Sequence, residues 1–430
     1  MSIYKNKKVV VIGLARSGIA AANLLKDLGA IVSATDSGDS PALRAKAEDS
    51  RSKGIAVETG RHTIDFIRGR DLAVVSPGVH PKSLALIWAR EFNIPVISEI
   101  ELAWSVCPAE VIAITGTNGK TTVTTLIAEV LNAAGKKTTA LGNIGKPFSR
   151  GVHSLKPGDF VSLEVSSFQL ETIDKFRPKV SVILNLTSDH LDRYKDISEY
   201  LAAKKRIFKN QSSDDYLVLN YDQPELRVLA KESKAKTVFF GKTCLGQNIP
   251  EQSNLNSNQL AVMAVCGILG VDREICLKVF AEFKGVEHRM EKVDNISGVD
   301  FINDSKATNV DSTVWALHNT LQPVILIAGG RDKNSDYKTI ADLIRQKVKL
   351  MVLIGEAREK ISKALEGVLP MRDAASMDEA VGLGFKQAKP GDCVLLSPMC
   401  ASFDMFDDYE HRGRVFKEIV RDLRKEIMGR

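Results

Sequence analysis

The middle of the chain reads Ala113-Ile114-Thr115-Gly116-Thr117-Asn118-Gly119-Lys120-Thr121-Thr122. An apolar run over residues 111–115 predicts a strand before the glycines, and apolar residues at helical spacing predict a helix over 121–134. Backbone N–H groups of such a turn can surround polyphosphate oxygens, while Lys120 reaches the β- and γ-phosphates and the Thr121 hydroxyl ligates Mg²⁺. We therefore expect residues 116–122, the ATP loop, to bind ATP, with a turn that has no ligand as the alternative.

A second glycine-rich turn, Gly13-Leu14-Ala15-Arg16-Ser17-Gly18, lies near the N-terminus. It joins a predicted strand over residues 8–13 to a predicted helix over 17–28, and the next predicted strand, 31–35, leads into Asp36. The spacing resembles the dinucleotide fingerprint, but Ala15 stands where a glycine normally lets the backbone approach a pyrophosphate. We expect a nucleotide-diphosphate site at this helix N-terminus rather than a nicotinamide cofactor. A structural turn remains the alternative.

Apolar, strand-like runs alternate with amphipathic helical stretches along nearly the whole chain. This rhythm is typical of parallel sheets covered by helices, so the fold class is α/β. The length of 430 residues suits about three domains. We expect a Rossmann-like N-terminal domain over 1–97, a P-loop-like central domain with a mostly parallel sheet over 98–297, and a Rossmann-like C-terminal domain over 298–430. The other predicted strands cover residues 71–76, 160–164, 180–185, 298–302, 324–328, 349–355 and 393–397.

Composition excludes several classes of protein. Hydrophobic residues make up 44% of the chain and charged residues 26%, as in ordinary globular proteins. No run approaches the roughly 18 apolar residues of a membrane span, and no secretory signal is evident. The net charge of +6 comes without an arginine-rich stripe, so we expect no nucleic-acid partner. The 6 scattered cysteines indicate reduced thiols without a zinc site, as in a cytoplasmic protein.

Further motifs follow the ATP loop. They read Glu164-Val165-Ser166-Ser167-Phe168-Gln169-Leu170-Glu171, Asn185-Leu186-Thr187-Ser188-Asp189-His190-Leu191-Asp192-Arg193-Tyr194, His288-Arg289, Asn303-Asp304-Ser305-Lys306-Ala307-Thr308-Asn309, Gly329-Gly330-Arg331-Asp332-Lys333 and Leu396-Ser397-Pro398-Met399-Cys400-Ala401-Ser402-Phe403-Asp404 with Tyr409-Glu410. Together with the loop, they resemble the Mur ligase family over nearly the whole chain.

The resemblance implies an ATP-dependent amide ligase that adds D-glutamate to UDP-N-acetylmuramoyl-L-alanine in cytoplasmic peptidoglycan precursor synthesis. Such a ligase activates a carboxylate as an acyl phosphate, which an amine attacks through a tetrahedral intermediate, so catalysis is mostly positioning and charge neutralisation. The resemblance also implies Mg²⁺ at two sites and small-molecule substrates, with neither nucleic acid nor membrane, and we expect a monomer.

The resemblance gives Lys120, Glu164 and His190 catalytic roles. Glu164 ends a predicted strand, where a carboxylate can ligate Mg²⁺ and meet the γ-phosphate; a solvent-facing acid is the alternative. His190 by itself would be a structural histidine, and the resemblance makes it a second metal position or a neighbour of the acyl phosphate. Asp189 would be a metal ligand or an orienting residue.

Lys204 belongs to a predicted helix on which Tyr200, Lys204 and Phe208 share a face. By itself the basic run predicts a solvated face. The resemblance implies that Lys204 is carbamylated, which would replace a cation that Mg²⁺ repels with an anionic oxygen ligand. Lys205 is the alternative in register.

The resemblance extends the ATP site to Asn258, Arg289 and Asp304. Asn258 comes just before a helix expected near Leu260, although Asn254 and Leu255 depart from the family pattern. Arg289 would contact the phosphates, with a structural ion pair as its alternative, and Asp304 would meet the ribose.

The resemblance also assigns the substrates. Lys306 would act on the phosphates or the reacting centre. A dicarboxylate needs cations and hydroxyls, and the residues implied for D-glutamate are Thr308, Lys333, Ser402, Phe403 and Tyr409. Ser402 could instead be a helix N-cap. The residues implied for the UDP end are Leu14, Ala15, Asp36 and Ser37, and those for the muramoyl-alanine part are Asn143 and Ser166.

Rival functions remain open. A related Mur-type or folylpolyglutamate ligase would use another amino acid. A nicotinamide oxidoreductase would use the first glycine turn, and a P-loop switch or transport ATPase would hydrolyse ATP without these substrates.

Overall fold

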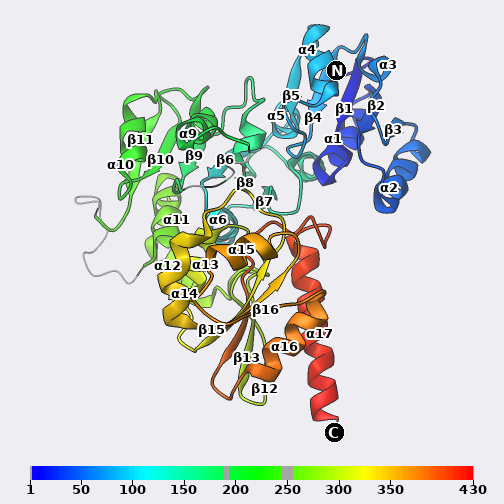
Figure 1. Cartoon of the computed structure of the whole chain (residues 1–430). Coiled ribbons are helices and arrows are strands. Elements are labelled where there is room, and N and C mark those ends of the chain that lie inside the picture. The colour runs from blue at the N-terminus through cyan, green and yellow to red at the C-terminus, as the bar shows by residue number, and fades with distance from the viewer. Residues whose placement is uncertain (1, 188, 190–192, 244–254, 430) are drawn as a thin grey trace. The chain divides into compact units, whose positions relative to one another are not determined.

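A computed structural model describes residues 2–187, 189, 193–243 and 255–429. The chain forms two compact units, and each is described by itself. Unit 1 comprises Met1–Leu186 and Ser198–Phe283, and unit 2 comprises Thr187–Ile197 and Lys284–Arg430. Unit 1 contains the first two sheets and unit 2 contains the third (Figure 1).

The first sheet has the strand order β3-β2-β1-β4-β5, and all its pairings are parallel. Its strands are β1 (Lys8–Ile12), β2 (Ile31–Asp36), β3 (Ala56–Thr59), β4 (Leu72–Val75) and β5 (Val96–Ser98). Its helices are α1 (Arg16–Asp27), α2 (Pro41–Ser52), α3 (Ile64–Ile67) and α4 (Leu84–Glu91), and α5 (Glu99–Trp104) follows. The central strand β1 is fully buried from Val9 to Ile12, as expected for a parallel strand covered on both faces.

The second sheet has the order β11-β10-β9-β6-β8-β7 and is also parallel throughout. Its strands are β6 (Glu110–Thr115), β7 (Thr138–Gly142), β8 (Phe160–Glu164), β9 (Val180–Ile183), β10 (Tyr216–Asn220) and β11 (Lys236–Phe240). The helices α6 (Lys120–Ala133), α11 (Ser257–Ile268) and α12 (Arg273–Glu282) pack their apolar residues on one face. The remaining helices are α7 (Phe148–Gly151), α8 (Ser167–Leu170), α9 (Ile197–Lys205) and α10 (Pro224–Arg227), with short 3₁₀ turns η1 (Val152–Ser154), η2 (Arg206–Phe208) and η3 (Val228–Lys231).

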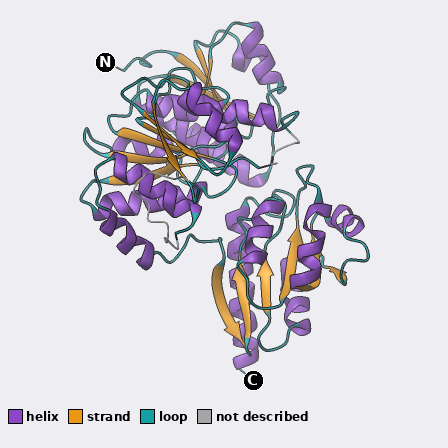
Figure 2. Ribbon diagram, turned by 90° about the vertical axis from the view of Figure 1, so that its left-hand side faces the viewer, coloured by secondary structure: helices purple, strands orange, loops and turns teal. Residues whose placement is uncertain are grey.

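The third sheet has the order β12-β13-β17-β14-β15-β16. Its strands are β12 (Glu291–Ile296), β13 (Val299–Asn303), β14 (Val324–Gly329), β15 (Val348–Ile354), β16 (Met371–Asp373) and β17 (Cys393–Leu396). One face is covered by α13 (Val310–His318), η4 (Tyr337–Ile340), α14 (Ala341–Lys347) and α15 (Arg358–Ala364), and the other by α16 (Met377–Gln387) and α17 (Tyr409–Met428), so helices flank the sheet on both sides (Figure 2).

The hairpin β12–β13 is antiparallel and spans the predicted boundary at 298. Residues 297 and 298 form its turn, so strand β12 belongs to the third sheet rather than to the central domain. The second compact unit begins at Lys284, 14 residues before the predicted boundary at 298. Sequence periodicity missed β12 because its residues are mostly half-exposed, which leaves no continuous apolar run.

The predicted strands are otherwise confirmed to within two residues at each end, and the helices predicted over 17–28 and 121–134 to within one. The strand predicted over 180–185 ends earlier, at Ile183, because Asn185 turns toward the ATP loop. Helix α11 begins at Ser257 rather than near Leu260, since Asn256 and Gln259 form a capping box there.

Two buried glutamates of α5 accept hydrogen bonds from loop and helix segments that adjoin the second sheet. Glu101 accepts hydrogen bonds from the backbone N–H groups of Asp174, Lys175 and Phe176, each at 2.9 Å. Glu99 accepts one at 2.6 Å from Ser149, while its other carboxylate oxygen has no hydrogen-bond partner among the described residues. Burial raises the pKa of Glu99 to about 7, although the bonds from Ser149 lower it.

The raised pKa of Glu99 predicts a pH effect on stability. The folded protein binds this proton more tightly than the unfolded chain does. The stabilisation that the bound proton adds to the free energy of unfolding is therefore fully present below about pH 4.5 and is lost as the pH rises to about 7. Over that window the loss is about 3 kcal/mol. Glu99→Gln should therefore raise Tm relative to the wild type by more at pH 8 than at pH 5. A calorimetric difference independent of pH would contradict this.

Candidate functional site

The ATP loop connects β6 to α6 at the carboxyl edge of the second sheet. Gly119 has a φ of 82°, a left-handed conformation that favours glycine. A Cβ at Gly119 would also collide with the side-chain oxygen of Asn258, so the predicted Asn258 does lie against the loop. Helix α6 begins at Lys120, which directs its first N–H groups toward the loop, where an anion is stabilised.

Asn185 is a site residue for which sequence analysis assigned no role. Its Oδ1 accepts hydrogen bonds from the backbone N–H groups of Thr117 at 3.0 Å and Asn118 at 2.8 Å. Its Nδ2 donates to the carbonyl of Asn118 at 3.0 Å. Three bonds from one side chain therefore hold the ATP loop. The sequence signal that could have identified Asn185 is a polar residue just after β9, a buried strand that pairs with β6.

Asn185→Ala should raise the KM for ATP roughly tenfold or more, because the loop loses three neutral hydrogen bonds of about 1 kcal/mol each. The matched control is Asn132→Ala. Asn132 also makes two 2.9 Å bonds to backbone, but to Thr138 at the far end of α6. Steady-state kinetics should show a raised KM for ATP only in the first variant; equal values would remove Asn185 from this role.

Two lysines meet at the carbonyl oxygen of Gly116. Lys120 Nζ donates to it at 3.0 Å and to the carbonyl of Thr117 at 2.8 Å. Lys204 Nζ donates to the same Gly116 oxygen at 2.9 Å. The side-chain nitrogens of both lysines therefore converge on one backbone oxygen of the ATP loop, and the Lys120 cation there favours a polyanion.

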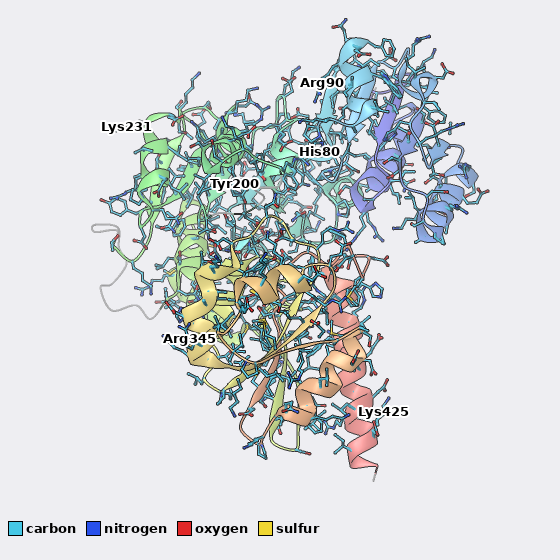
Figure 3. All side chains as sticks on the ribbon, viewed as in Figure 1. His80, Arg90, Tyr200, Lys231, Arg345 and Lys425 are labelled. Atoms are coloured by element: carbon cyan, nitrogen blue, oxygen red, sulfur yellow. The ribbon has the colours of Figure 1, made fainter. Side chains whose placement is uncertain are left out.

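The prediction of a solvated face around Lys204 is wrong. Lys204 is 1% exposed and Tyr200 2%, and the Lys204 side-chain nitrogen lies 4.2 Å from the centre of the Tyr200 ring. Figure 3 labels Tyr200, which belongs to α9. Phe208 falls in η2, after the helix ends, but is buried as well. Lys205, the alternative in register, forms an ion pair with Glu232 instead.

Glu164 ends β8, directly beside the strand that leads into the ATP loop. It pairs with Ile114 in the parallel register and is 1% exposed, so the solvent-facing alternative is wrong. Its Oε1 accepts a hydrogen bond from Asn143 Nδ2 at 3.0 Å, which places two predicted residues together. Ser166, two residues later, uses its hydroxyl to cap α8 in a capping box with Gln169.

The first glycine turn is held by Asp36. One carboxylate oxygen accepts from Leu14 N at 2.7 Å and the other from Gly38 N at 2.8 Å. A Cβ at Gly18 would collide with the carbonyl oxygen of Gly13, so the turn and helix pack closely. Ala15 is the N-cap of α1 and provides no side-chain cap, and Ser37 is exposed. A pocket of about 450 Å³ lies along α1, between Arg16 and Asp27.

In unit 2, Asp304 is buried. Its carboxylate accepts hydrogen bonds from Met290 N at 3.2 Å and Ser397 Oγ at 2.9 Å. Burial raises the pKa of Asp304 to about 7 against the opposing effects of Arg289 and these bonds. The Nε atom of Arg289 is buried and makes no hydrogen bond among the described residues.

Other predicted residues of unit 2 follow the carboxyl ends of its strands. Lys306 Nζ donates to the Tyr409 hydroxyl at 2.9 Å and lies 4.5 Å from that ring's centre. Thr308 is half-buried, and Lys333 Nζ lies 3.6 Å from Asp189, a residue of the same unit. His190 lies outside the described residues.

Ser402 and Phe403 follow β17 and differ in exposure. Ser402 is buried and Phe403 is 63% exposed. The N-cap of the following helix α17 is Asp408, whose side chain accepts from His411 N at 2.7 Å. The alternative role of Ser402 as that cap is therefore wrong.

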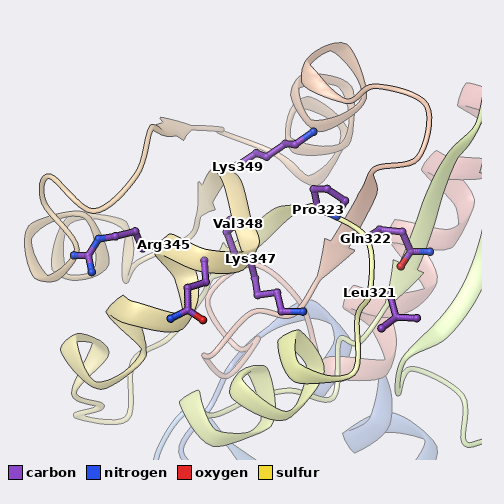
Figure 4. A pocket seen from close by; sticks show the side chains of 8 residues that line it. Leu321, Gln322, Pro323, Arg345, Lys347, Val348 and Lys349 are labelled. Carbon is purple, nitrogen blue, oxygen red and sulfur yellow. The ribbon is translucent and has the colours of Figure 1, made fainter.

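Unit 2 also contains a basic pocket of about 550 Å³, lined in part by Arg345, Lys347 and Lys349 (Figure 4). It lies at the starts of β14 and β15, opposite the strand ends where ligands bind in open α/β sheets. Two of its charges are paired, Arg345 with Asp342 and Lys349 with Asp392, and Lys347 donates a hydrogen bond to the Thr320 carbonyl. This pocket is not part of the predicted site.

The chain matches three protein-family models. They are described as Mur ligase MurD-like, N-terminal domain, over residues 7–98, Mur ligase middle domain over 114–283, and Mur ligase, glutamate ligase domain, over 288–400. It is 41% identical to the UDP-N-acetylmuramoylalanine–D-glutamate ligases of Koribacter versatilis and Thermoanaerobacter pseudethanolicus, over 98% of this chain and 99% of each relative.

Solved structures share the fold. One is the UDP-N-acetylmuramate-alanine ligase MurC of Thermotoga maritima, with a TM-score of 0.65 and 19% identity over 97% of this chain and 100% of that one. Another is the Thermotoga maritima MurF ligase in complex with ADP, with a TM-score of 0.60 and 15% identity over 98% and 96% of the two chains. Within the described residues, no helix is long and apolar enough to cross a membrane. The full-length identity and the three matched domains lead to one conclusion: this chain belongs to the Mur ligase family.

Proposed function

We propose that this protein joins D-glutamate to UDP-N-acetylmuramoyl-L-alanine and converts ATP to ADP and phosphate. The observation that carries the proposal is that Lys120 and Lys204 both donate to the Gly116 carbonyl, beside the buried Glu164. The chain that contains this arrangement is 41% identical to a UDP-N-acetylmuramoylalanine–D-glutamate ligase. A cationic loop with a neighbouring carboxylate suits a metal-bound triphosphate.

The first proposed metal site uses three residues of unit 1. The Thr121 hydroxyl at the start of α6, the Glu164 carboxylate and a carbamylated Lys204 offer the oxygen ligands that Mg²⁺ prefers, and His190 would be a ligand of a second ion. The fit rests on the burial of all three described residues. Thr121 belongs to the ATP loop, Glu164 pairs with Ile114 just before it, and Lys204 donates to its Gly116 carbonyl. Bound Mg²⁺ would neutralise charge on the phosphates.

The remaining chemistry is positioning. N–H groups of residues 116–122 and the Lys120 ammonium hold the triphosphate so that a substrate carboxylate oxygen attacks its γ-phosphorus and ADP leaves. Asn258, Arg289 and Asp304 complete the nucleotide contacts. The amine of D-glutamate then attacks the acyl carbon and loses a proton, and phosphate leaves from the tetrahedral intermediate, with Lys306 compensating the charge that develops.

The substrates are assigned to the strand ends. Leu14, Ala15, Asp36 and Ser37 would hold the UDP end, because the uncapped N-terminus of α1 favours a diphosphate. Asn143 and Ser166 would contact the muramoyl-alanine part. The residues proposed for D-glutamate are Thr308, Lys333, Ser402, Phe403 and Tyr409.

We further propose three domains, with boundaries near residues 97 and 283, acting as a monomer in the cytoplasm. The first boundary is supported by α5, whose Glu99 and Glu101 bond to segments around the second sheet. The second is supported by the pairing of β12 with the third sheet.

The decisive assay measures phosphate release from ATP with Mg²⁺, UDP-N-acetylmuramoyl-L-alanine and one amino acid at a time. We expect release with D-glutamate and not with L-lysine, diaminopimelate or L-glutamate. Release with one of the others would establish a different ligase, and release without any amino acid would indicate a simple ATPase.

A further inference from the structure

Two loops of unit 2 that carry proposed D-glutamate residues are joined to each other. The first, residues 329–335, follows β14 and carries Lys333; the second, residues 397–403, follows β17 and carries Ser402. Arg331 and Ala401 form an antiparallel bridge, with N···O distances of 2.8 and 3.0 Å. We call these segments the first and second acceptor loops.

A buried tyrosine adds a side-chain connection between them. Tyr337, 1% exposed, donates its hydroxyl proton to Asp332 Oδ1 at 2.7 Å in the first acceptor loop. The same hydroxyl oxygen lies 3.0 Å from Cys400 Sγ in the second. Burial raises the pKa of Cys400 to about 12, so this residue is a thiol at neutral pH. Since the only phenol proton goes to Asp332, the thiol donates to Tyr337.

Asp332 is the organising group of the first acceptor loop. Besides the Tyr337 hydroxyl, its carboxylate accepts from Asn334 N at 3.0 Å and Ser335 N at 3.1 Å, directly after Lys333. It also pairs with Lys360 at 2.5 Å. These partners lower the pKa of Asp332 although burial opposes them, so the carboxylate is ionised at neutral pH.

The second acceptor loop has one further anchor. The buried Arg412 guanidinium donates to the carbonyl of Cys400 at 3.2 Å and to that of Ser305 at 2.8 Å, next to Lys306. Stability alone does not require polar groups in this interior, because apolar side chains could fill it and leave no polar group unsatisfied. Hydrogen bonds give these loops a defined geometry, which a site for a small dicarboxylate requires.

We propose that Tyr337 and Asp332 are positioning residues for the amino-acid substrate, holding Lys333 and Ser402 at a set separation through the chain Cys400–Tyr337–Asp332. The inference rests on the proposed function, because Lys333 and Ser402 are assigned to D-glutamate there. Neither Tyr337 nor Asp332 contacts the substrate in this role. Their effect is on the geometry of the two acceptor loops.

The test compares Tyr337→Phe and Asp332→Asn with a matched control, Tyr4→Phe. Tyr4 is also buried and its hydroxyl bonds to Ser105 at 2.8 Å, but it lies in unit 1. We expect the KM for D-glutamate to rise roughly five- to tenfold in Tyr337→Phe and more in Asp332→Asn, as loss of neutral and charged hydrogen bonds predicts. The KM values for ATP and the muramoyl nucleotide should match those of Tyr4→Phe. The double variant should lose less than the sum of the single effects.

An unchanged KM for D-glutamate, or an equal rise in all three KM values, would overturn the proposal. If the wild-type enzyme did not use D-glutamate, the proposed function would fail separately. Hydrogen exchange then decides: Tyr337→Phe should speed exchange in residues 331–335 and 398–403 relative to Tyr4→Phe. Unchanged exchange in both segments would overturn the positioning role.

Discussion

Lys120→Ala is expected to lower ATP-dependent phosphate release by at least about 1,000-fold, the scale on which removal of a cation from a transferring phosphoryl group acts. Lys120 Nζ already lies at the ATP loop, bonded to the carbonyls of Gly116 and Thr117. Lys204, which also reaches the Gly116 carbonyl, is buried and cannot replace Lys120 without leaving its own contacts. The measurement is single-turnover phosphate release at saturating substrates.

The matched control is Lys136→Ala. Lys136 follows the other end of the same helix and lies 6.0 Å from the Phe160 ring, away from the loop. It should keep wild-type turnover. Retention of activity in Lys120→Ala, with an unchanged Tm in both variants, would remove Lys120 from the phosphate site and with it the main support for the proposed reaction.

Lys204→Ala is expected to lower turnover about 100-fold or more, because an anionic oxygen ligand of Mg²⁺ would be lost. Formate or acetate should restore part of the activity, since a small carboxylate can occupy the space vacated by a carbamate. The position is enclosed, with Lys204 1% exposed beneath the Gly116 carbonyl and against Tyr200. Turnover measured against carboxylate concentration is the readout.

Lys205→Ala is the control for register. Its ammonium pairs with Glu232 near the surface, an interaction worth about 1 kcal/mol or less. This variant should keep its turnover and gain nothing from added carboxylate. If added carboxylate rescued Lys205→Ala instead of Lys204→Ala, the carbamylated residue would be Lys205. If it rescued neither variant, the proposal of a carbamylated lysine would be rejected.

The sheets could be predicted well because parallel strands buried on both faces are continuous apolar runs, as in Val9–Ile12 and Phe160–Glu164. No strand was predicted for β3, β5, β7, β10, β11, β12 or β16. In β12 and β16 few side chains are buried, so these two strands have no continuous apolar run that periodicity could detect. The predicted boundary at 298 divides the β12–β13 hairpin for the same reason, because only pairing with β13 assigns β12 to the third sheet.

The sequence by itself determined the chemistry available to this protein: a glycine–lysine turn between a strand and a helix, carboxylates at strand ends, and motifs that resemble one ligase family along nearly the whole chain. Those signals are local, because a turn and the helix after it are encoded within a few residues. Only the tertiary structure decided that Lys204 is buried against Gly116, that Asn185 holds the ATP loop, and that Tyr337 contacts Cys400, which lies 63 residues further along the chain. Burial and hydrogen bonding between distant segments depend on how sheets bring strand ends together, which no short stretch of sequence specifies.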